Sequence, residues 1–136
     1  MNNTLGIRHL ALKVRKFKEC LHFYNVILKM EIDWQPDDEN VYLTNGKDNL
    51  ALHFDNTIDL SSQCRLDHFG ILLQKKEDVD LWHNYICENK VKIFKPVNDH
   101  RDGSRSFYCY DPDGNIVQLI WHCLLYTSDA ADELTS

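Results

Sequence analysis

The sequence predicts an α+β fold made of two copies of one unit, each running strand, helix and then several strands. Two observations support this. The spacing of apolar residues changes from alternation to a helical period and back, twice along the chain. Overlaying His9 on His68 also places Phe23 on Trp82. The 136 residues suit one domain, and one such unit buries only one face of a small sheet. We therefore expect the two copies to pack together.

The first unit, about residues 6–56, begins with an alternating strand at residues 7–14. Residues 16–30 carry apolar side chains at helical spacing and predict an amphipathic helix. A hairpin then follows, in which Asn45-Gly46 is a strong turn signal. Its two strands are predicted at residues 41–44 and 49–54.

The second unit, about residues 65–122, repeats this order of elements. It predicts a strand at 66–73, a helix at 77–89, a short strand at 91–94 and a hairpin of 106–110 with 115–121. The hairpin turns at Asp111-Pro112-Asp113-Gly114, which has turn chemistry throughout. Between the short strand and the hairpin we expect a loop from Lys92 to Arg105.

Composition and charge exclude several classes of protein. The formal net charge is −6, so the basic excess typical of nucleic-acid binding is missing. No apolar run approaches the roughly 20 residues that cross a bilayer, and the N-terminus does not resemble an export signal. The five cysteines are scattered without a Cys-x-x-Cys pair, which is typical of free thiols in a reducing compartment. We expect a cytoplasmic protein.

The last fourteen residues, 123–136, differ in character from the rest. Most of this segment resembles the translation of a transposase sequencing adapter, so we expect a non-native tail outside the domain at 6–122. The alternative is a natural acidic tail that frays as chain ends do.

Strand alternation separates the candidate site residues from the core. Leu10, Leu12 and Val14 should pack on the helices, so His9 points the other way, and His68 does the same in its own strand. In the hairpin of the first unit, His53 is expected opposite its more apolar neighbours, although a slip of one residue would reverse this. In the last strand, the alternation leaves the face of Gln118 open.

Four segments together carry a resemblance to a known family. They are His9-Leu10-Ala11-Leu12-Lys13-Val14, His22-Phe23-Tyr24, Leu66-Asp67-His68 and the stretch from Ser106 to Asn115. In their order and spacing, residues 6–122 resemble the vicinal oxygen chelate superfamily, which includes glyoxalase I, fosfomycin-resistance thiol transferases, extradiol dioxygenases and bleomycin-binding proteins. The resemblance implies two βαβββ modules whose sheets form a cup-shaped curved mixed sheet with helices outside. It also implies a homodimer.

The resemblance implies a divalent metal ion in the cup, held by His9, His68 and Gln118. Zinc, nickel, manganese and iron are not distinguished by these ligands. The position four residues after Gly114 usually holds glutamate in the thiol transferases and in glyoxalase I, and here it is Gln118. A neutral amide is a weaker ligand and cannot act as a general base. His53 could supply that base, or a fourth ligand, since histidine titrates in the required range.

Arg101, Arg105 and Tyr108 are the predicted substrate-binding residues. They lie in or beside the basic loop before the last hairpin, and in the resembling thiol transferases this segment contacts an anionic substrate. Guanidinium groups favour phosphonate, carboxylate or enolate oxygens. A solvated loop of mixed charge is the alternative for each single residue.

The leading functional hypothesis is a metal-dependent lyase or thiol transferase of the glyoxalase and fosfomycin-resistance type. It would act on a small oxygen-chelating, anionic substrate, with a thiol as a further candidate partner. The alternative is a non-catalytic, drug-sequestering binding protein of the same fold, with a cavity lined by aromatic side chains such as Trp34, Tyr42, Phe107 and Tyr108. A purely structural role is a third alternative.

Overall fold

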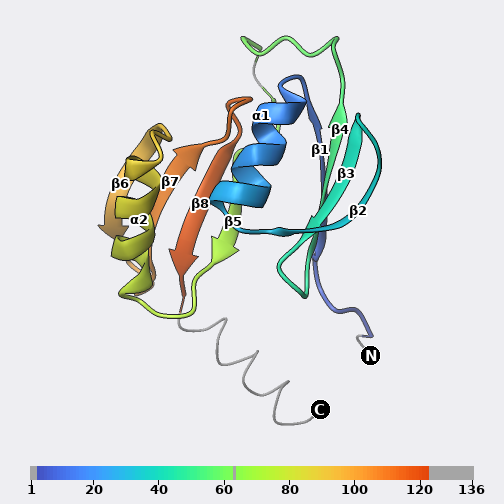
Figure 1. The fold of residues 1–136 in the computed structure, drawn as a ribbon. Helices are drawn as coiled ribbons and strands as arrows, with labels where there is room; N and C mark the ends of the chain where they lie inside the picture. The colour runs from blue at the N-terminus through green and yellow to red at the C-terminus, as the bar shows by residue number, and fades with distance from the viewer. Residues whose placement is uncertain (1–2, 63, 123–136) are drawn as a thin grey trace. The chain divides into compact units, whose positions relative to one another are not determined.

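The computed structural model describes residues 3–62 and 64–122 and divides into two compact units on either side of residue 63. Each unit contains one four-stranded sheet and one helical layer (Figure 1). Both units run strand, helix and three strands, so the predicted α+β fold of two βαβββ modules is confirmed. The predicted tail at 123–136 lies outside the described residues.

The first unit forms its sheet in the order β1-β4-β3-β2. β1 pairs with β4 in parallel and the other pairs are antiparallel. Its elements are β1 (His9–Val14), α1 (Phe17–His22), the π-helical continuation η1 (Phe23–Ile27), β2 (Glu31–Asp37), β3 (Asn40–Thr44) and β4 (Asn49–Phe54).

The core of the first unit lies between the sheet and α1, which packs on β4. Leu12 and Leu52 face it from neighbouring positions on β1 and β4, and Tyr24 is fully buried beside Phe23. The helical segment ends at Ile27, and Lys29, just after the C-cap Leu28, has a left-handed φ of 63°, as is common after a last helical turn.

Strand β2 was not predicted from the sequence. All of its side chains are exposed, and its pairing with β3 shifts register twice. Without a buried face, the strand has no reason to alternate apolar with polar residues, so its pattern resembles that of a loop.

The second unit forms its sheet in the order β5-β8-β7-β6, the same arrangement as in the first unit. Its elements are β5 (Phe69–Leu72), α2 (Asp78–Glu88), β6 (Ile93–Asp99), β7 (Arg105–Tyr110) and β8 (Ile116–Trp121). Here too the first strand pairs in parallel with the last, while the other pairs are antiparallel.

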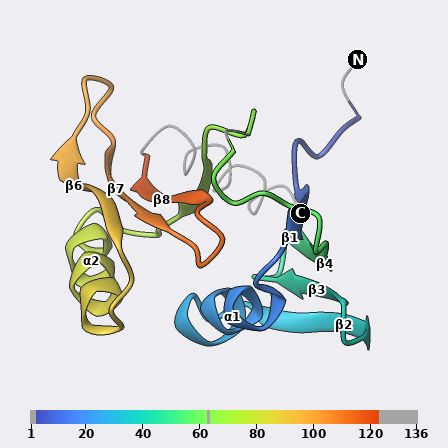
Figure 2. The ribbon, with the colours of Figure 1, turned by 90° about the horizontal axis from the view of Figure 1, so that it is seen from above.

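Helix α2 covers one face of the second sheet, where it contacts β6, β7 and β8 (Figure 2). Val79 and Ile86 of α2 are fully buried, as are Phe107 and Leu119 on the sheet. The ring of His83 on α2 meets that of Phe107 edge to face at 5.2 Å. Residues 105, 107, 117 and 119 therefore mark the helix-facing side of this sheet.

The prediction of a loop from Lys92 to Arg105 is wrong for the first half of this segment, which forms a strand. Strand β6 continues to Asp99, and only the turn around Gly103 is irregular. Among the described residues β6 is an edge strand that pairs with β7 alone, and the register of this pairing shifts around Pro96. Proline is tolerated on such an edge strand, but in the sequence it is typical of the end of a strand.

No helix among the described residues is long and apolar enough to cross a membrane.

Candidate functional site

One face of the first sheet carries His9 and His53. His9 lies beside Asn49 in the parallel register, and Lys13 lies beside His53, so the two histidines project from the same side. Leu12 and Leu52 project from the opposite, buried side. The predicted alternation of the first unit therefore holds in the structure.

Both histidines donate a hydrogen bond through Nδ1 to an asparagine. Nδ1 of His9 lies 2.8 Å from Oδ1 of Asn49, and Nδ1 of His53 lies 2.6 Å from Oδ1 of Asn40. An amide oxygen only accepts, so in each neutral ring the proton is on Nδ1 and the lone pair is on Nε2. This is the arrangement in which an imidazole binds a metal ion or accepts a proton.

The corresponding face of the second sheet brings together His68, Tyr108 and Gln118. Gln118 lies between Gly70 of β5 and Tyr108 of β7 in register, which settles the face that the sequence left open. His68 lies one residue before β5, and its ring meets that of Tyr108 edge to face at 5.3 Å. Its Nδ1 lies 2.6 Å from Oδ2 of Asp67, so its Nε2 is also left available.

The side chain of Gln118 is oriented by two hydroxyl groups. Its Nε2 donates to Oγ of Ser106 and to the hydroxyl of Tyr108, each at 3.0 Å. Ser106 is in turn bonded to Nε2 of His100 at 2.7 Å. Gln118 is only 8% exposed, yet within the described chain no hydrogen bond reaches its Oε1. A buried carbonyl oxygen without a donor is a position at which an ion or water is expected.

These donors fit a divalent metal ion. Imidazole nitrogens suit zinc, nickel and iron, and the carbonyl oxygen of an amide is the kind of ligand that manganese prefers. His68 and Gln118 both contact Tyr108 in the second unit, whereas His9 belongs to the first unit. Over residues 3–62 and 64–122, no group of three or more His, Cys, Asp or Glu side chains is gathered to hold a metal. Glutamine is outside that set, so a site of this kind depends on Gln118.

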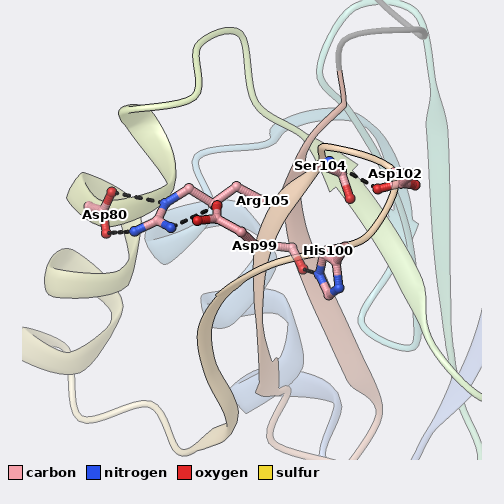
Figure 3. A network of polar contacts seen from close by, with 7 residues as sticks. Asp80, Asp99, His100, Asp102, Ser104 and Arg105 are labelled. Atoms are coloured by element: carbon pink, nitrogen blue, oxygen red, sulfur yellow. Dashed lines mark hydrogen bonds and ion pairs between the residues drawn. The ribbon is translucent and has the colours of Figure 1, made fainter.

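Arg105 is engaged in two ion pairs on the opposite, helix-facing side of the second sheet (Figure 3). Its Nη2 lies 2.9 Å from Oδ1 of Asp80 on α2, and its Nη1 lies 2.9 Å from Oδ1 of Asp99 on β6. These carboxylates raise the pKa of Arg105, and the hydrogen bond from Arg105 lowers the pKa of Asp99. The structure thus directs Arg105 away from Tyr108, and its contact with substrate stays a prediction.

The other two predicted substrate residues differ in their surroundings. Arg101 is exposed in the turn between β6 and β7. Tyr108 is half-buried, and the ammonium group of Lys95 lies 5.7 Å from the centre of its ring. Lys95 pairs with Tyr108 in register, so it supplies positive charge near the ring of Tyr108.

Several residues around these side chains were missed by the sequence interpretation. They are the hydrogen-bond partners Asn40, Asn49, Asp67, His100 and Ser106. Only Asp67 had a local signal, because it directly precedes His68. Phe107, predicted as a cavity residue of a binding protein, is instead fully buried on the α2 side.

Two βαβββ units with the same strand order define a class of paired-module proteins. The chain belongs to the Glyoxalase/Bleomycin resistance protein/Dioxygenase superfamily, whose family model matches residues 6–119. This match confirms the family predicted from the sequence.

Known relatives support this assignment. The chain is 28% identical over 116 residues to metallothiol transferase FosB of Staphylococcus saprophyticus. This match covers 84% of this chain and 75% of that protein. Among solved structures, lactoylglutathione lyase of Agrobacterium tumefaciens matches with a TM-score of 0.73 at 21% identity, covering 88% of this chain and 96% of that one. A superfamily member from Alicyclobacillus acidocaldarius matches with a TM-score of 0.70, also at 21% identity, covering 90% and 95%. The structural matches show the shared fold.

Proposed function

We propose that this protein is a metal-dependent enzyme of the glyoxalase and fosfomycin-resistance type that acts on a small, anionic, oxygen-chelating substrate. The observation that carries the proposal is the buried Oε1 of Gln118, which receives no hydrogen bond within the described chain. Gln118 and His68 both contact Tyr108. The similarity to a metallothiol transferase adds support and makes a thiol the favoured second substrate.

In this proposal His9, His68 and Gln118 hold one divalent ion. When bound, the ion supplies a Lewis acid for a substrate oxygen. Asp67 and Asn49 orient the two imidazoles by accepting their Nδ1 protons. Ser106 and Tyr108 direct the Gln118 carbonyl by accepting its amide protons.

Substrate handling falls to other side chains of the same faces. The positive charge of Lys95 attracts an anion toward Tyr108. The hydroxyl of Tyr108 accepts from Gln118 and keeps its own proton for a substrate oxygen. His53 provides a proton acceptor at Nε2, a role that the neutral Gln118 cannot take. We also expect Arg101 to contact substrate and the protein to act as a cytoplasmic homodimer.

Metal binding is tested by metal analysis and by thermal unfolding with added manganese, nickel or zinc. A ligand at one hundred times its Kd adds about 2.7 kcal/mol to the free energy of unfolding, so the Tm should rise by several degrees. His68→Ala should abolish this rise, whereas His22→Ala, which removes an exposed histidine of α1, should keep it. An unchanged rise in His68→Ala would reject the proposed ligand set.

A non-catalytic binding protein is the second candidate. It is favoured by the neutral residue at position 118 and by the stacked pair of Trp34 and Tyr42, whose rings lie 5.3 Å apart. Trp34 is 60% exposed and so offers a surface for an aromatic ligand. The affinity for an aromatic ligand can be measured from the quenching of tryptophan fluorescence. If the protein binds no metal, and His68→Ala leaves this affinity unchanged, this candidate replaces the first.

A further inference from the structure

We infer that Asp37 and Asn40 are positioning residues that fix the tautomer of His53, with the proton on Nδ1 and the lone pair on Nε2. The catalytic meaning of this inference rests on the proposed function, in which Nε2 of His53 accepts a proton. The tautomer itself is a property of the chain alone.

The three side chains form a chain of hydrogen bonds along one sheet face. Asp37 is the last residue of β2 and pairs with Asn40, the first residue of β3, and Asn40 lies opposite His53 of β4. Nδ2 of Asn40 donates to Oδ1 of Asp37 at 2.9 Å and to its Oδ2 at 3.2 Å. On its other side, Oδ1 of Asn40 lies 2.6 Å from Nδ1 of His53.

Asp37 decides which way the amide of Asn40 points. The backbone amide of Glu39 and the side chain of Asn40 both donate to Asp37, and they lower the pKa of its carboxyl group. An ionised carboxylate can only accept, so it holds the NH₂ group of Asn40 toward itself. The carbonyl oxygen of Asn40 must then face His53, and it too can only accept.

The ring of His53 has a second constraint. Tyr42 lies two residues after Asn40 on β3, and its ring meets that of His53 edge to face at 5.9 Å. Tyr42 is stacked on Trp34 in turn. The hydrogen bond sets which nitrogen carries the proton, and the aromatic contact limits the tilt of the ring. A base held in this way needs no reorientation before it accepts a proton.

The tautomer can be read from the ¹⁵N chemical shifts of the imidazole nitrogens in the full-length protein, above the pH range in which histidine is charged. The wild type should show His53 with a roughly fivefold excess of the Nδ1–H form, which is the ratio that one hydrogen bond of ordinary net strength can maintain. Asn40→Leu removes the acceptor and should reduce this excess severalfold toward the Nε2–H form. Asn40→Asp keeps an acceptor and should preserve Nδ1–H.

Two further variants make the test specific. Asp37→Asn allows the side-chain amide of Asn40 to flip by 180°. It should also reduce the excess of the Nδ1–H form of His53, while the hairpin of β2 and β3 is retained. Asn49→Leu removes the matching acceptor from His9 and should leave the signals of His53 unchanged. A wild-type His53 protonated at Nε2, or an unchanged ratio in both Asn40→Leu and Asp37→Asn, would overturn the inference. If the tautomer is fixed but the protein neither binds metal nor turns over substrate, only the proposed function fails.

Discussion

At the scale of the single residue, position 118 shows what a motif can and cannot provide. The distance from Gly114 identified Gln118 in the sequence, and the register of β8 places it beside Tyr108. The sequence could not reveal the donors that orient the amide, because Ser106 and Tyr108 meet Gln118 only through strand pairing. Hydrogen-bond partners across a sheet depend on register, which is a tertiary property.

The neutral ligand at position 118 leads to the first prediction. Hydroxyl groups rotate, so Ser106 and Tyr108 can donate to a carboxylate as readily as they accept from an amide. Gln118→Glu should therefore fold normally and bind a divalent ion at least about tenfold more tightly, since ligand charge raises affinity. Gln118→Leu should lose binding. Isothermal titration with manganese measures both, and equal affinities in all three proteins would contradict Gln118 as a ligand.

The buried thiol of Cys109 leads to the second prediction. Burial, with a smaller contribution from the Asp111 carboxylate, raises its pKa from 9.0 to about 12. The folded protein should thus keep this thiol protonated, while exposed Cys64 and Cys87 react with iodoacetamide. Mass spectrometry of the labelled native protein checks this, and labelling of Cys109 as fast as Cys87 would count against it.

The same shift has a definite sign for stability. Between pH 9.0 and about 12 the unfolded chain releases a thiol proton that the folded chain retains. The free energy of unfolding should therefore fall as the pH rises through this range. Urea unfolding of the wild type and of Cys109→Ala should show a shallower fall in the variant. Parallel curves would exclude this contribution.

At the scale of the element, burial on one face separates what was predictable from what was not. Helix α2 and strands such as β8 bury one face against each other, so their spacing of apolar residues gave their positions within a few residues. The exposed edge strands β2 and β6 have no such constraint. β2 was missed entirely and β6 was predicted too short, because strands whose side chains are mostly exposed need not alternate apolar with polar residues.

The two faces of α2 allow a matched test of this reasoning. Ile86 is fully buried, whereas Leu81 on the same helix is 65% exposed. Ile86→Ala should lower the free energy of unfolding by about 2–4 kcal/mol, because it removes core contacts and leaves a cavity. Leu81→Ala should change it by less than about 0.5 kcal/mol. Urea unfolding measures both, and comparable losses would mean that α2 is not packed through Ile86.

At the scale of the whole molecule, the sequence repeat corresponds to a repeat of topology. The shared offset of His9 and His68 predicted two equivalent units, and both sheets have the same strand order. The proposed ligands divide between the units, with His9 in the first and His68 and Gln118 in the second. One ion bound by both sets would make metal binding a property of the whole chain.

This division leads to the last prediction, which uses His9→Ala, His68→Ala and the double variant. If one ion needs both imidazoles, either single variant should remove nearly all of the metal-induced rise in Tm, and the double variant should lose no more. Without metal, the two substitutions should have additive effects, because neither histidine then shares a bound ion with the other. Two independent sites would instead give a partial loss in each single variant, and the losses would sum in the double variant. Thermal unfolding of the wild type, the two single variants and the double variant, with manganese and with a chelator, distinguishes these outcomes. All ligands of a shared ion contribute to one binding free energy, and it is this free energy that raises the Tm.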